Sequence, residues 1–300
     1  MILVVGATGM LGSEVCRQLA EAGRPVRAMV RTTSDPAKVA ALRAMGAEIV
    51  QGDLRDAASL AAACRGADAV IETVSAMPFS YVAGENDIQT TDTEGSASLI
   101  AAARSAGVAH FVYTSFSRNI DDPFPLRDAK RATETLLRSS GMDYTILRPS
   151  CFMEVWLTPA VGFDFPNGKA TIYGTGDAGI SYIAVPDVAE FAVRSLDEPA
   201  ARNAVIELGG PQPVSQAEAV RIFERAAGRS FETTHVPDGV LQAQYDAATD
   251  PMQRSFAGLM RCVARGDAID MSPALEVLPI RLTSVAEYAE KVAGRRPVLV

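Results

Sequence analysis

The stretch MILVVGATGMLG, Met1 to Gly12, decides the fold of this chain of 300 residues. Its first part, Ile2 to Val5, is an uninterrupted apolar run rich in β-branched residues, which predicts a strand buried on both faces of a parallel sheet. A glycine-rich turn follows, and the apolar residues after it repeat at helical spacing: Leu11, Val15 and Leu19. Strand, glycine turn and helix together predict a dinucleotide-binding turn within a doubly wound parallel α/β sheet.

The three glycines have separate tasks in such a turn. Gly6 permits the sharp backbone turn, Gly9 lets a pyrophosphate approach the backbone, and Gly12 lets the helix pack close to the strand. Unpaired N–H groups at the start of the helix carry its positive dipole end, so phosphate is expected there. Glycines also mark ordinary turns, but the flanking strand and helix favour the nucleotide interpretation. The expected contacts from this turn are Gly6, Thr8, Gly9, Met10, Leu11 and Gly12.

Composition limits the classes of partner. The net charge is −8 with both signs dispersed, which argues against nucleic acid or an anionic membrane held by bulk electrostatics. No apolar run approaches the roughly 18 residues that span a bilayer, and Met1 leads directly into the first strand, so neither a membrane span nor a leader is expected. We therefore expect a cytoplasmic protein with a small-molecule substrate. The sequence leaves the oligomeric state open, a homo-oligomer included.

Metal and disulfide chemistry are not predicted. The chain has only two histidines, and its four cysteines show no Cys-x-x-Cys spacing, so buried and reduced thiols are expected. The cysteines are Cys16, Cys64, Cys151 and Cys262.

The end of the second predicted strand, residues 25–30, carries the signal for cofactor choice. A Rossmann fold selective for NAD usually places Asp or Glu about 20 residues past the glycines, where it binds the ribose hydroxyls. This chain offers Arg31, Thr32 and Ser34 instead. A guanidinium with hydroxyls suits a 2′-phosphate, because Arg presents forked donors to phosphate oxygens. We expect NADP(H) to be preferred over NAD(H), with a solvated surface arginine as the alternative.

The ends of the later strands should add further residues to the cofactor crevice, because ligands of open α/β sheets bind beyond the carboxyl ends of the strands. These strands are predicted at residues 47–50, 68–74, 110–114, 143–148 and 203–208. The end of the strand predicted at 68–74 therefore contributes Thr73, Val74 and Ser75. Residues 76–90 are interpreted as a flap over the site.

The chain resembles the NmrA-like branch of the atypical short-chain dehydrogenases/reductases. The resemblance begins with GATGMLG, which has GxxGxxG spacing, and continues through GAEIVQGDLRD, AGVAHFVYTS, DYTILRPSCFME and ISYIAVPDVAEFAV. It covers most of the chain up to about residue 235 and is thinner after that. Within this branch the chain is similar to bacterial type 2 quinone reductases and to isoflavone-reductase-like proteins.

The resemblance implies roles for residues at three strand ends. It implies that Asp53 and Leu54 contact the adenine, although an aspartate after a strand is also a common helix N-cap. It puts Thr114 and Ser115 where short-chain reductases have a catalytic serine, so Ser115 is a candidate catalytic residue, with a turn-forming serine as the alternative. At the nicotinamide end it implies contacts from Pro149, Ser150 and Phe152.

The resemblance also points to Lys130, in the predicted helix RDAKRATETLLRSSG. Ordinary short-chain reductases carry Tyr-x-x-x-Lys on one helix face; the lysine holds the nicotinamide ribose and lowers the pKa of the tyrosine, which donates a proton. This chain keeps the lysine, as a candidate catalytic and cofactor-binding residue, but has Leu126 in place of the tyrosine. Simple ketone or alcohol chemistry is therefore in doubt, and a solvated helix lysine is the alternative. A substitute phenol is left open at Tyr81, Tyr173, Tyr182 and Tyr245.

We expect residues 1–154 to form the nucleotide-binding domain, with residues 179–208 returning to it. Residues 155–300 should form mainly a smaller C-terminal substrate lid, because the composition shifts there toward aromatic residues, Gly and Pro. Within this part a strand is predicted at 180–185 and a helical segment at 238–265.

Two functions of different classes follow from these expectations. The first is NADPH-dependent transfer of a hydride to a quinone or a similar conjugated apolar acceptor. The second is a non-catalytic NADP(H)-sensing regulator, which is implied by resemblance to the protein after which the family is named. Turnover of NADPH separates the two, because a sensor binds the cofactor without consuming it.

Overall fold

The centre of the molecule is a parallel sheet of seven strands, in a computed structural model that describes residues 1–77 and 81–294. The strand order is β10-β6-β5-β4-β1-β2-β3, so the winding direction reverses between β1 and β4. Such a reversal opens a crevice at the carboxyl ends of the strands. The strands are β1 (Ile2–Val5), β2 (Val26–Val30), β3 (Glu48–Gln51), β4 (Ala69–Glu72), β5 (His110–Thr114), β6 (Asp143–Pro149) and β10 (Ala204–Leu208).

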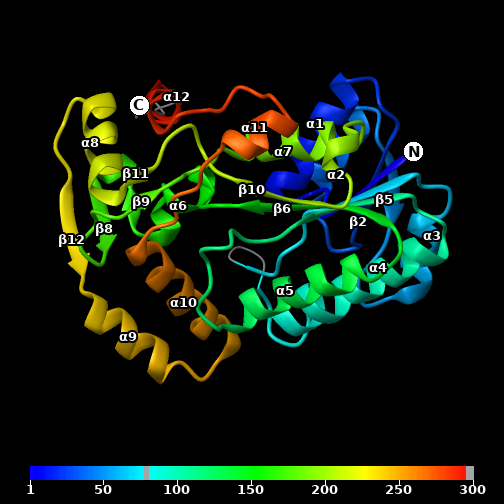
Figure 1. Cartoon of the computed structure of the whole chain (residues 1–300), viewed down its shortest axis with the longest axis horizontal. Coiled ribbons are helices and arrows are strands. Elements are labelled where there is room, and N and C mark those ends of the chain that lie inside the picture. Colours follow the sequence, from blue (N-terminus) through cyan, green and yellow to red (C-terminus); the bar gives the residue numbers. More distant parts are fainter. Residues whose placement is uncertain (78–80, 295–300) are drawn as a thin grey trace.

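Helices cover both faces of this sheet (Figure 1). On one face lie α1 (Met10–Glu21), α2 (Pro36–Ala44), α7 (Val185–Arg194) and α11 (Ser272–Val277). On the other face lie α3 (Ala57–Cys64), α4 (Glu94–Ser105) and α5 (Pro125–Arg138). The predicted doubly wound α/β fold is confirmed.

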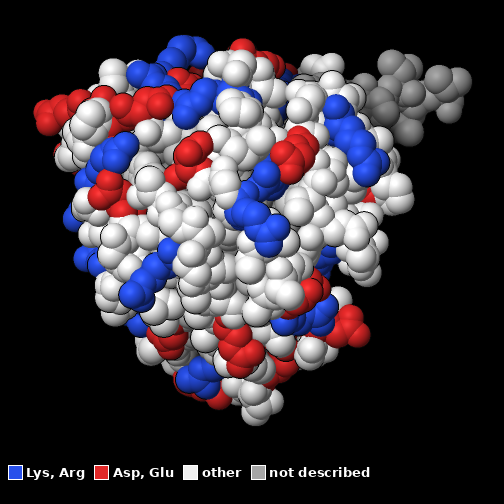
Figure 2. Space-filling model, turned by 90° about the vertical axis from the view of Figure 1, so that its right-hand side faces the viewer, with Lys and Arg blue, Asp and Glu red and all other residues white. Residues whose placement is uncertain are grey.

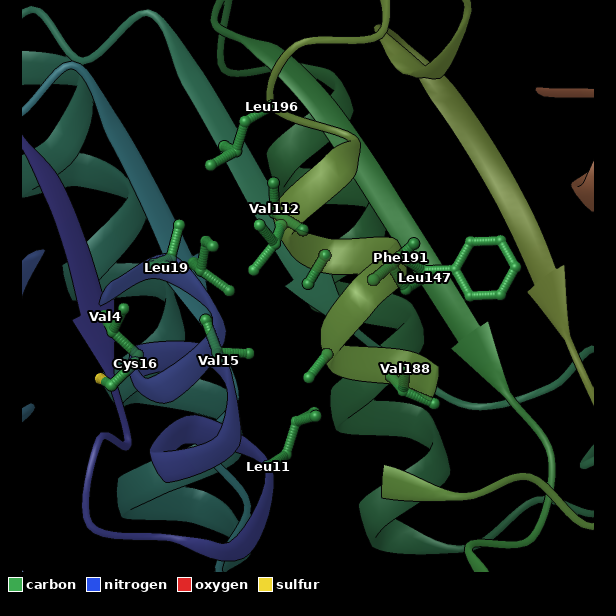
Figure 3. Close-up of a cluster of buried hydrophobic side chains, with 14 of the residues drawn as sticks. Val4, Leu11, Val15, Cys16, Leu19, Val112, Leu147, Val188, Phe191 and Leu196 are labelled. Carbon is green, nitrogen blue, oxygen red and sulfur yellow. The ribbon is translucent and has the colours of Figure 1, made fainter. Parts of the chain in front are cut away.

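The packing of α1 and α7 on the sheet anchors the glycine turn. Leu11 and Val15 of α1 and Val188 and Phe191 of α7 belong to one buried cluster with strand residues such as Val4 (Figure 3). Burial of a Val, Leu or Phe side chain stabilises the fold by roughly 1.5–3 kcal/mol. The apolar stripe that predicted the first helix is therefore also what holds the start of that helix against β1.

The C-terminal part, at the left of Figure 1, has its own small sheets and core. Strand β8 (Lys169–Tyr173) pairs with β7 (Phe163–Asp164) and β12 (Glu232–Val236), and β9 (Gly179–Ile180) pairs with β11 (Val214–Ser215). Its helices are α6 (Met153–Trp156), α8 (Gln216–Ala227), α9 (Asp238–Ala247), α10 (Pro251–Arg265) and α12 (Val285–Gly294). Short 3-10 turns occur at η2 (Pro159–Val161), η3 (Phe165–Asn167) and η4 (Pro199–Ala201). The domain division at residue 154 stays a prediction.

Three sequence-based assignments need correction. The strand predicted at 180–185 shrinks to β9, because Val185 already begins α7 and the residues between make only isolated bridges. The helical segment 238–265 is two helices, because Asp250 caps α10 and Pro251 cannot continue a preceding helix. The predicted flap ends in η1 (Ile88–Thr93), a π-helical turn that leads into α4. Residues 78–80 of that flap lie outside the described residues.

Charge is mixed over the surface. Figure 2 shows basic and acidic side chains interspersed over one face of the molecule, so this face presents no continuous field of one sign. Among the described residues, no helix is long and apolar enough to cross a membrane. All four cysteines are buried.

Candidate active site

A cleft of about 950 Å³ lies at the carboxyl ends of the central strands. Its walls come from the β1–α1 turn, from the ends of β2, β4, β5 and β6, and from α10 in the C-terminal part. Small-molecule sites usually have volumes of roughly 300–1,000 Å³, so this cleft suits a large or extended ligand.

The β1–α1 turn presents bare backbone to the cleft. Gly6 has a φ of +84°, which glycine adopts without strain, and its carbonyl accepts a hydrogen bond from Gly9 N at 2.8 Å. A Cβ at Gly12 would lie 2.2 Å from the Gly6 carbonyl oxygen, so only glycine lets α1 pack this close. Gly9 is the N-cap of α1 and offers no side-chain cap, which leaves the first N–H groups open to an anion. The turn therefore fits the pyrophosphate of a dinucleotide.

Two cations line the cleft near the end of β2. Arg31 donates from Nη1 to Asn86 Oδ1 at 3.2 Å and from its backbone N to Ser34 Oγ at 3.0 Å. Lys38, in the first turn of α2, donates from Nζ to the Thr8 carbonyl at 3.3 Å and so lies against the glycine turn. We did not predict Lys38 from the sequence. The signal that could have found it is a basic residue one turn into the helix that follows β2.

Asp53 and Leu54 line the same region of the cleft. The Asp53 carboxylate accepts hydrogen bonds from the Arg55 guanidinium at 2.8 and 3.0 Å, and these lower the pKa of Asp53 to about 2. The negative charge of Asp53 is therefore permanent near neutral pH and is paired with Arg55. The predicted contact with an adenine stays a prediction.

Most residues predicted to bind a cofactor line this one cleft. They are Gly6, Thr8, Gly9, Met10, Leu11, Arg31, Ser34, Asp53, Leu54, Thr73, Val74, Ser75, Thr114, Lys130, Pro149, Ser150 and Phe152. Gly12 and Thr32 do not line it, whereas Thr33 does. A turn closed by Ser34 N and the Arg31 carbonyl at 3.0 Å leaves Thr32 outside. Binding of a cofactor by these residues stays a prediction.

Lys130 lies on α5, one turn after Leu126, and its side chain is buried at the floor of the cleft. Its Nζ donates to the Val74 carbonyl at 2.9 Å and pairs with the Asp92 carboxylate at 3.1 Å. It also lies 5.3 Å from the centre of the Tyr113 ring. An ammonium group has three N–H donors, and among the described residues only the contact with Val74 has the geometry of a hydrogen bond, so at least one donor is left for a ligand in the cleft.

Beside this ion pair lies Glu72, a carboxyl at the end of β4 that sequence reasoning did not single out. It is completely buried, and Ser96 Oγ donates to its Oε1 at 2.6 Å. Burial raises the pKa of Glu72 to about 7, although the nearby charge of Lys130 opposes the rise. Near neutral pH the group is therefore poised between its neutral and charged forms.

Glu72 should make the stability of the protein depend on pH. Its folded-state pKa of about 7 lies above the ordinary glutamate value of 4.5, so the folded state binds the proton more tightly and loses stability as pH rises between these values. The loss attributable to this group is about 3 kcal/mol. Chemical denaturation should show that the unfolding free energy of the parent falls between pH 4.5 and about 7. The unfolding free energy of Glu72→Gln should lack this fall, so the difference between the two proteins changes with pH. A constant difference over that range would contradict the expectation.

Ser115, the second candidate catalytic residue, is held by a salt-bridge network. Its hydroxyl donates to Glu134 Oε1 at 2.5 Å, and that carboxylate also accepts from Arg131 at 2.7 Å and from Arg148 at 2.9 Å. Because the Ser115 hydroxyl is bound to Glu134, the geometry fits a role in positioning the cleft lining as well as a catalytic role. The neighbouring Thr114 Oγ1 is buried and has no hydrogen-bond partner among the described residues.

No tyrosine reaches the cleft from the lid. All seven tyrosines of the chain fall within the described residues, and none of them lines the cleft. Tyr173 donates to the Val161 carbonyl at 2.9 Å, and Tyr245 donates to the Pro123 carbonyl. Tyr182 is buried in the core of the C-terminal part. The four candidate phenols are thus absent from the lining, and the position of the missing tyrosine is filled by Leu126.

The end of the cleft beyond Lys130 is apolar. Its wall combines side chains from the α5 start, from the segment after β6 and from α10. They include Phe116, Ile120, Leu126, Val155, Trp156, Val161, Phe256, Leu259 and Met260. Cys151 also lines this end, but burial raises the pKa of its thiol, which disfavours the thiolate. The sequence predicted an apolar lid, and the wall residues of α10 lie in the helical segment that was predicted at 238–265.

The cleft, the glycine turn and the buried Lys130 are together typical of dinucleotide-dependent enzymes. The comparisons with known proteins agree. The model of the NmrA-like family matches residues 1–289. The NAD(P)H azoreductase of Xenophilus azovorans is 33% identical over 98% of this chain and 93% of its own length. The photosystem II assembly factor Ycf39 of Synechocystis sp. is 30% identical over 98% of this chain and 91% of its own length.

Among solved structures, the NADPH-dependent quinone oxidoreductase QOR2 of Escherichia coli, complexed with NADPH, superimposes with a TM-score of 0.78 at 25% identity. The match covers 97% of this chain and 99% of that chain. The chain belongs to the NmrA-like family. Within it, the chain is an NAD(P)H-dependent oxidoreductase.

Proposed function

We propose that this protein transfers a hydride from NADPH to a quinone or a comparable conjugated, apolar acceptor. The observation that carries the proposal is the lining of the acceptor end, where Leu126 precedes Lys130 by one turn and no tyrosine or histidine is present among the described residues. Reduction of an isolated ketone yields an alkoxide, which needs a proton in the transition state, an effect worth about 10²–10⁴-fold. Hydride addition to a quinone instead gives an aromatic hydroquinone anion, which can take its proton later from water.

The residues of the chain would bind the cofactor, orient it toward the acceptor and exclude water. NADPH supplies the hydride when it is bound. The glycine turn and the N-terminus of α1 would bind the pyrophosphate, and Lys130 would donate a free N–H to the nicotinamide ribose. Leu126, Trp156 and Phe256 line the acceptor end and would limit the access of water to a bound acceptor. One hydride and one solvent proton convert a quinone to its hydroquinone, so the two-electron reaction balances.

The proposed preference for NADPH over NADH rests on Arg31 and Lys38. Arg31 follows β2, and Lys38 lies on the adjacent α2, so two cations are available to one 2′-phosphate. No carboxylate follows β2 directly, and Asp53 is paired with Arg55. A charge-assisted contact to phosphate contributes roughly 1.5–3 kcal/mol, or about ten- to a hundredfold in affinity.

The acceptor class is tested by steady-state assays with NADPH and two sets of acceptors, menadione and p-benzoquinone against cyclohexanone and acetophenone. We expect kcat/KM to be at least about 100-fold higher for the quinones, because the site has no tyrosine among its described residues to donate the proton that ketone reduction needs. Faster turnover of the ketones would contradict the proposal. Tight NADPH binding without turnover of any acceptor would support the non-catalytic regulator instead.

A further inference from the structure

We infer that Asp92 is a positioning residue, whose carboxylate holds the Lys130 ammonium at the nicotinamide end of the cleft. The inference deepens the proposed function and rests on it for the reaction concerned. Its basis is one ion pair between two deeply buried groups, with Nζ and Oδ1 3.1 Å apart and side-chain exposures of 3% for Lys130 and 0% for Asp92.

The local backbone around Asp92 is unusual. Asp92 lies in η1, a π-helical turn that begins after Asp87, whose carboxylate accepts from Thr90 N at 2.8 Å and caps the turn. The hydrogen bonds of a π-turn span five residues instead of the four of an α-helix, and such turns occur frequently at functional sites. The turn changes to regular α4 at Glu94, so the irregularity is confined to the segment that carries Asp92 toward the cleft floor.

Asp92 connects three elements that meet below the nicotinamide end. Its Oδ1 pairs with Lys130 on α5, and its Oδ2 accepts from Ala76 N at 3.0 Å in the loop after β4. Its backbone carbonyl accepts from Thr133 Oγ1 at 3.2 Å, one turn further along α5. Because Lys130 also donates to Val74 in the same loop, the carboxylate fixes the ammonium and the cleft lining relative to each other.

The neighbouring groups make Asp92 the partner on which Lys130 depends. The charged or titratable groups around the ammonium are Asp92 from η1, Glu72 from β4 and Tyr113 from β5. Glu72 is bound by Ser96, and burial raises its pKa to about 7, so near neutral pH it carries only part of a compensating charge, whereas Asp92 makes the direct ion pair. A lysine has a flexible four-carbon stem, and without Asp92 its ammonium would turn toward the cleft or toward solvent. Its remaining donor would then no longer be fixed for a ribose hydroxyl.

The first test is kinetic and uses Asp92→Asn, which keeps the shape and an acceptor for Ala76 N but removes the charge. We expect kcat with menadione to fall about tenfold or more, with the Kd for NADPH changing less than about threefold, because the adenosine contacts are intact. Asp87→Asn is the matched control, since it removes a carboxylate from the same turn while asparagine still caps it, and its kcat should equal that of the parent.

A double-mutant cycle separates action through Lys130 from a structural role. If Asp92 acts through Lys130, Asp92→Asn should lower kcat in the parent and have no further effect in the Lys130→Met background. An equal fold-loss in both backgrounds, or no loss in the parent, would overturn the inference.

A readout without turnover keeps this inference distinct from the proposed function. The chain has four lysines, Lys38, Lys130, Lys169 and Lys291, so isotope-labelled lysine gives few side-chain signals, and Lys130→Met assigns the relevant one. In the parent, NADP⁺ should shift the Lys130 signal, whereas 2′,5′-ADP, which lacks nicotinamide, should not. In Asp92→Asn the shift with NADP⁺ should be lost. The inference would be overturned if NADP⁺ does not shift the Lys130 signal of the parent, or if it shifts that signal in Asp92→Asn as much as in the parent. This holds even if no acceptor is ever turned over.

Discussion

Replacement of Lys130 by methionine is expected to lower kcat with a quinone by about 100-fold or more, because a misplacement of a reacting group by about 1 Å can cost that much. Methionine keeps much of the length and apolar stem of lysine but removes every N–H donor. The nicotinamide ribose then loses the donor that is held by Asp92 and Val74. Binding of 2′,5′-ADP, which occupies only the adenosine end, should remain close to that of the parent.

The control for this variant addresses folding. Lys130→Met leaves Asp92 as a buried charge without its partner, a situation that typically costs 3–5 kcal/mol. The double variant Lys130→Met/Asp92→Asn removes the charge and should recover stability but not activity. Recovery of activity in the double variant, or a parental rate in Lys130→Met, would show that the ammonium has no part in hydride transfer.

The second large effect is expected at the adenosine end of the cleft. Arg31→Asp should invert the cofactor preference, because a carboxylate repels a 2′-phosphate and accepts hydrogen bonds from free ribose hydroxyls. The affinity for NADPH should fall by about ten- to a hundredfold or more, and Lys38→Ala should lower it in the same direction. Isothermal titration of each variant with NADP⁺ and NAD⁺ gives both affinities directly.

Arg43→Ala is the matched control for these charge changes. Arg43 lies in the last turn of α2 and is exposed, and it does not line the cleft. Its removal lowers the positive charge near the same helix without touching the site, so both affinities should stay at parental values. Equal affinities of the parent for NADP⁺ and NAD⁺ would contradict the proposed preference.

Most strands of the central sheet could be predicted because they are short, mainly apolar runs that end at turn residues, although the edge strand β3 is only partly buried. Burial on both faces requires such runs, and Ile2–Val5 and His110–Thr114 are fully buried. The same criterion failed at 180–185, where the apolar run is buried but, within the described part of the chain, has no strand partner beyond β9. Apolarity reports burial, and only pairing decides whether a buried segment is a strand.

The parts of the site that follow strand ends could also be predicted, because the topology of the sheet brings those ends together. The partners of Lys130 could not. Asp92 lies 38 positions away in the chain, and its approach depends on a π-turn that has no clear sequence signature. Glu72 ends an apolar strand and, without the fold, cannot be distinguished from a solvent-facing residue. Lys38 was missed because a basic residue early in a helix usually faces water.

The most direct test of the proposed chemistry is a single-turnover experiment. Enzyme-bound NADPH is mixed with menadione, and the loss of NADPH absorbance is followed. The proposal predicts that deuterium at the transferred position of NADPH slows the observed step, whereas D₂O as solvent does not, because no protein group delivers a proton in the transition state. If D₂O slows the step as much as the deuterated cofactor does, a proton donor acts in the transition state, and the proposal that Leu126 leaves the site without one is wrong.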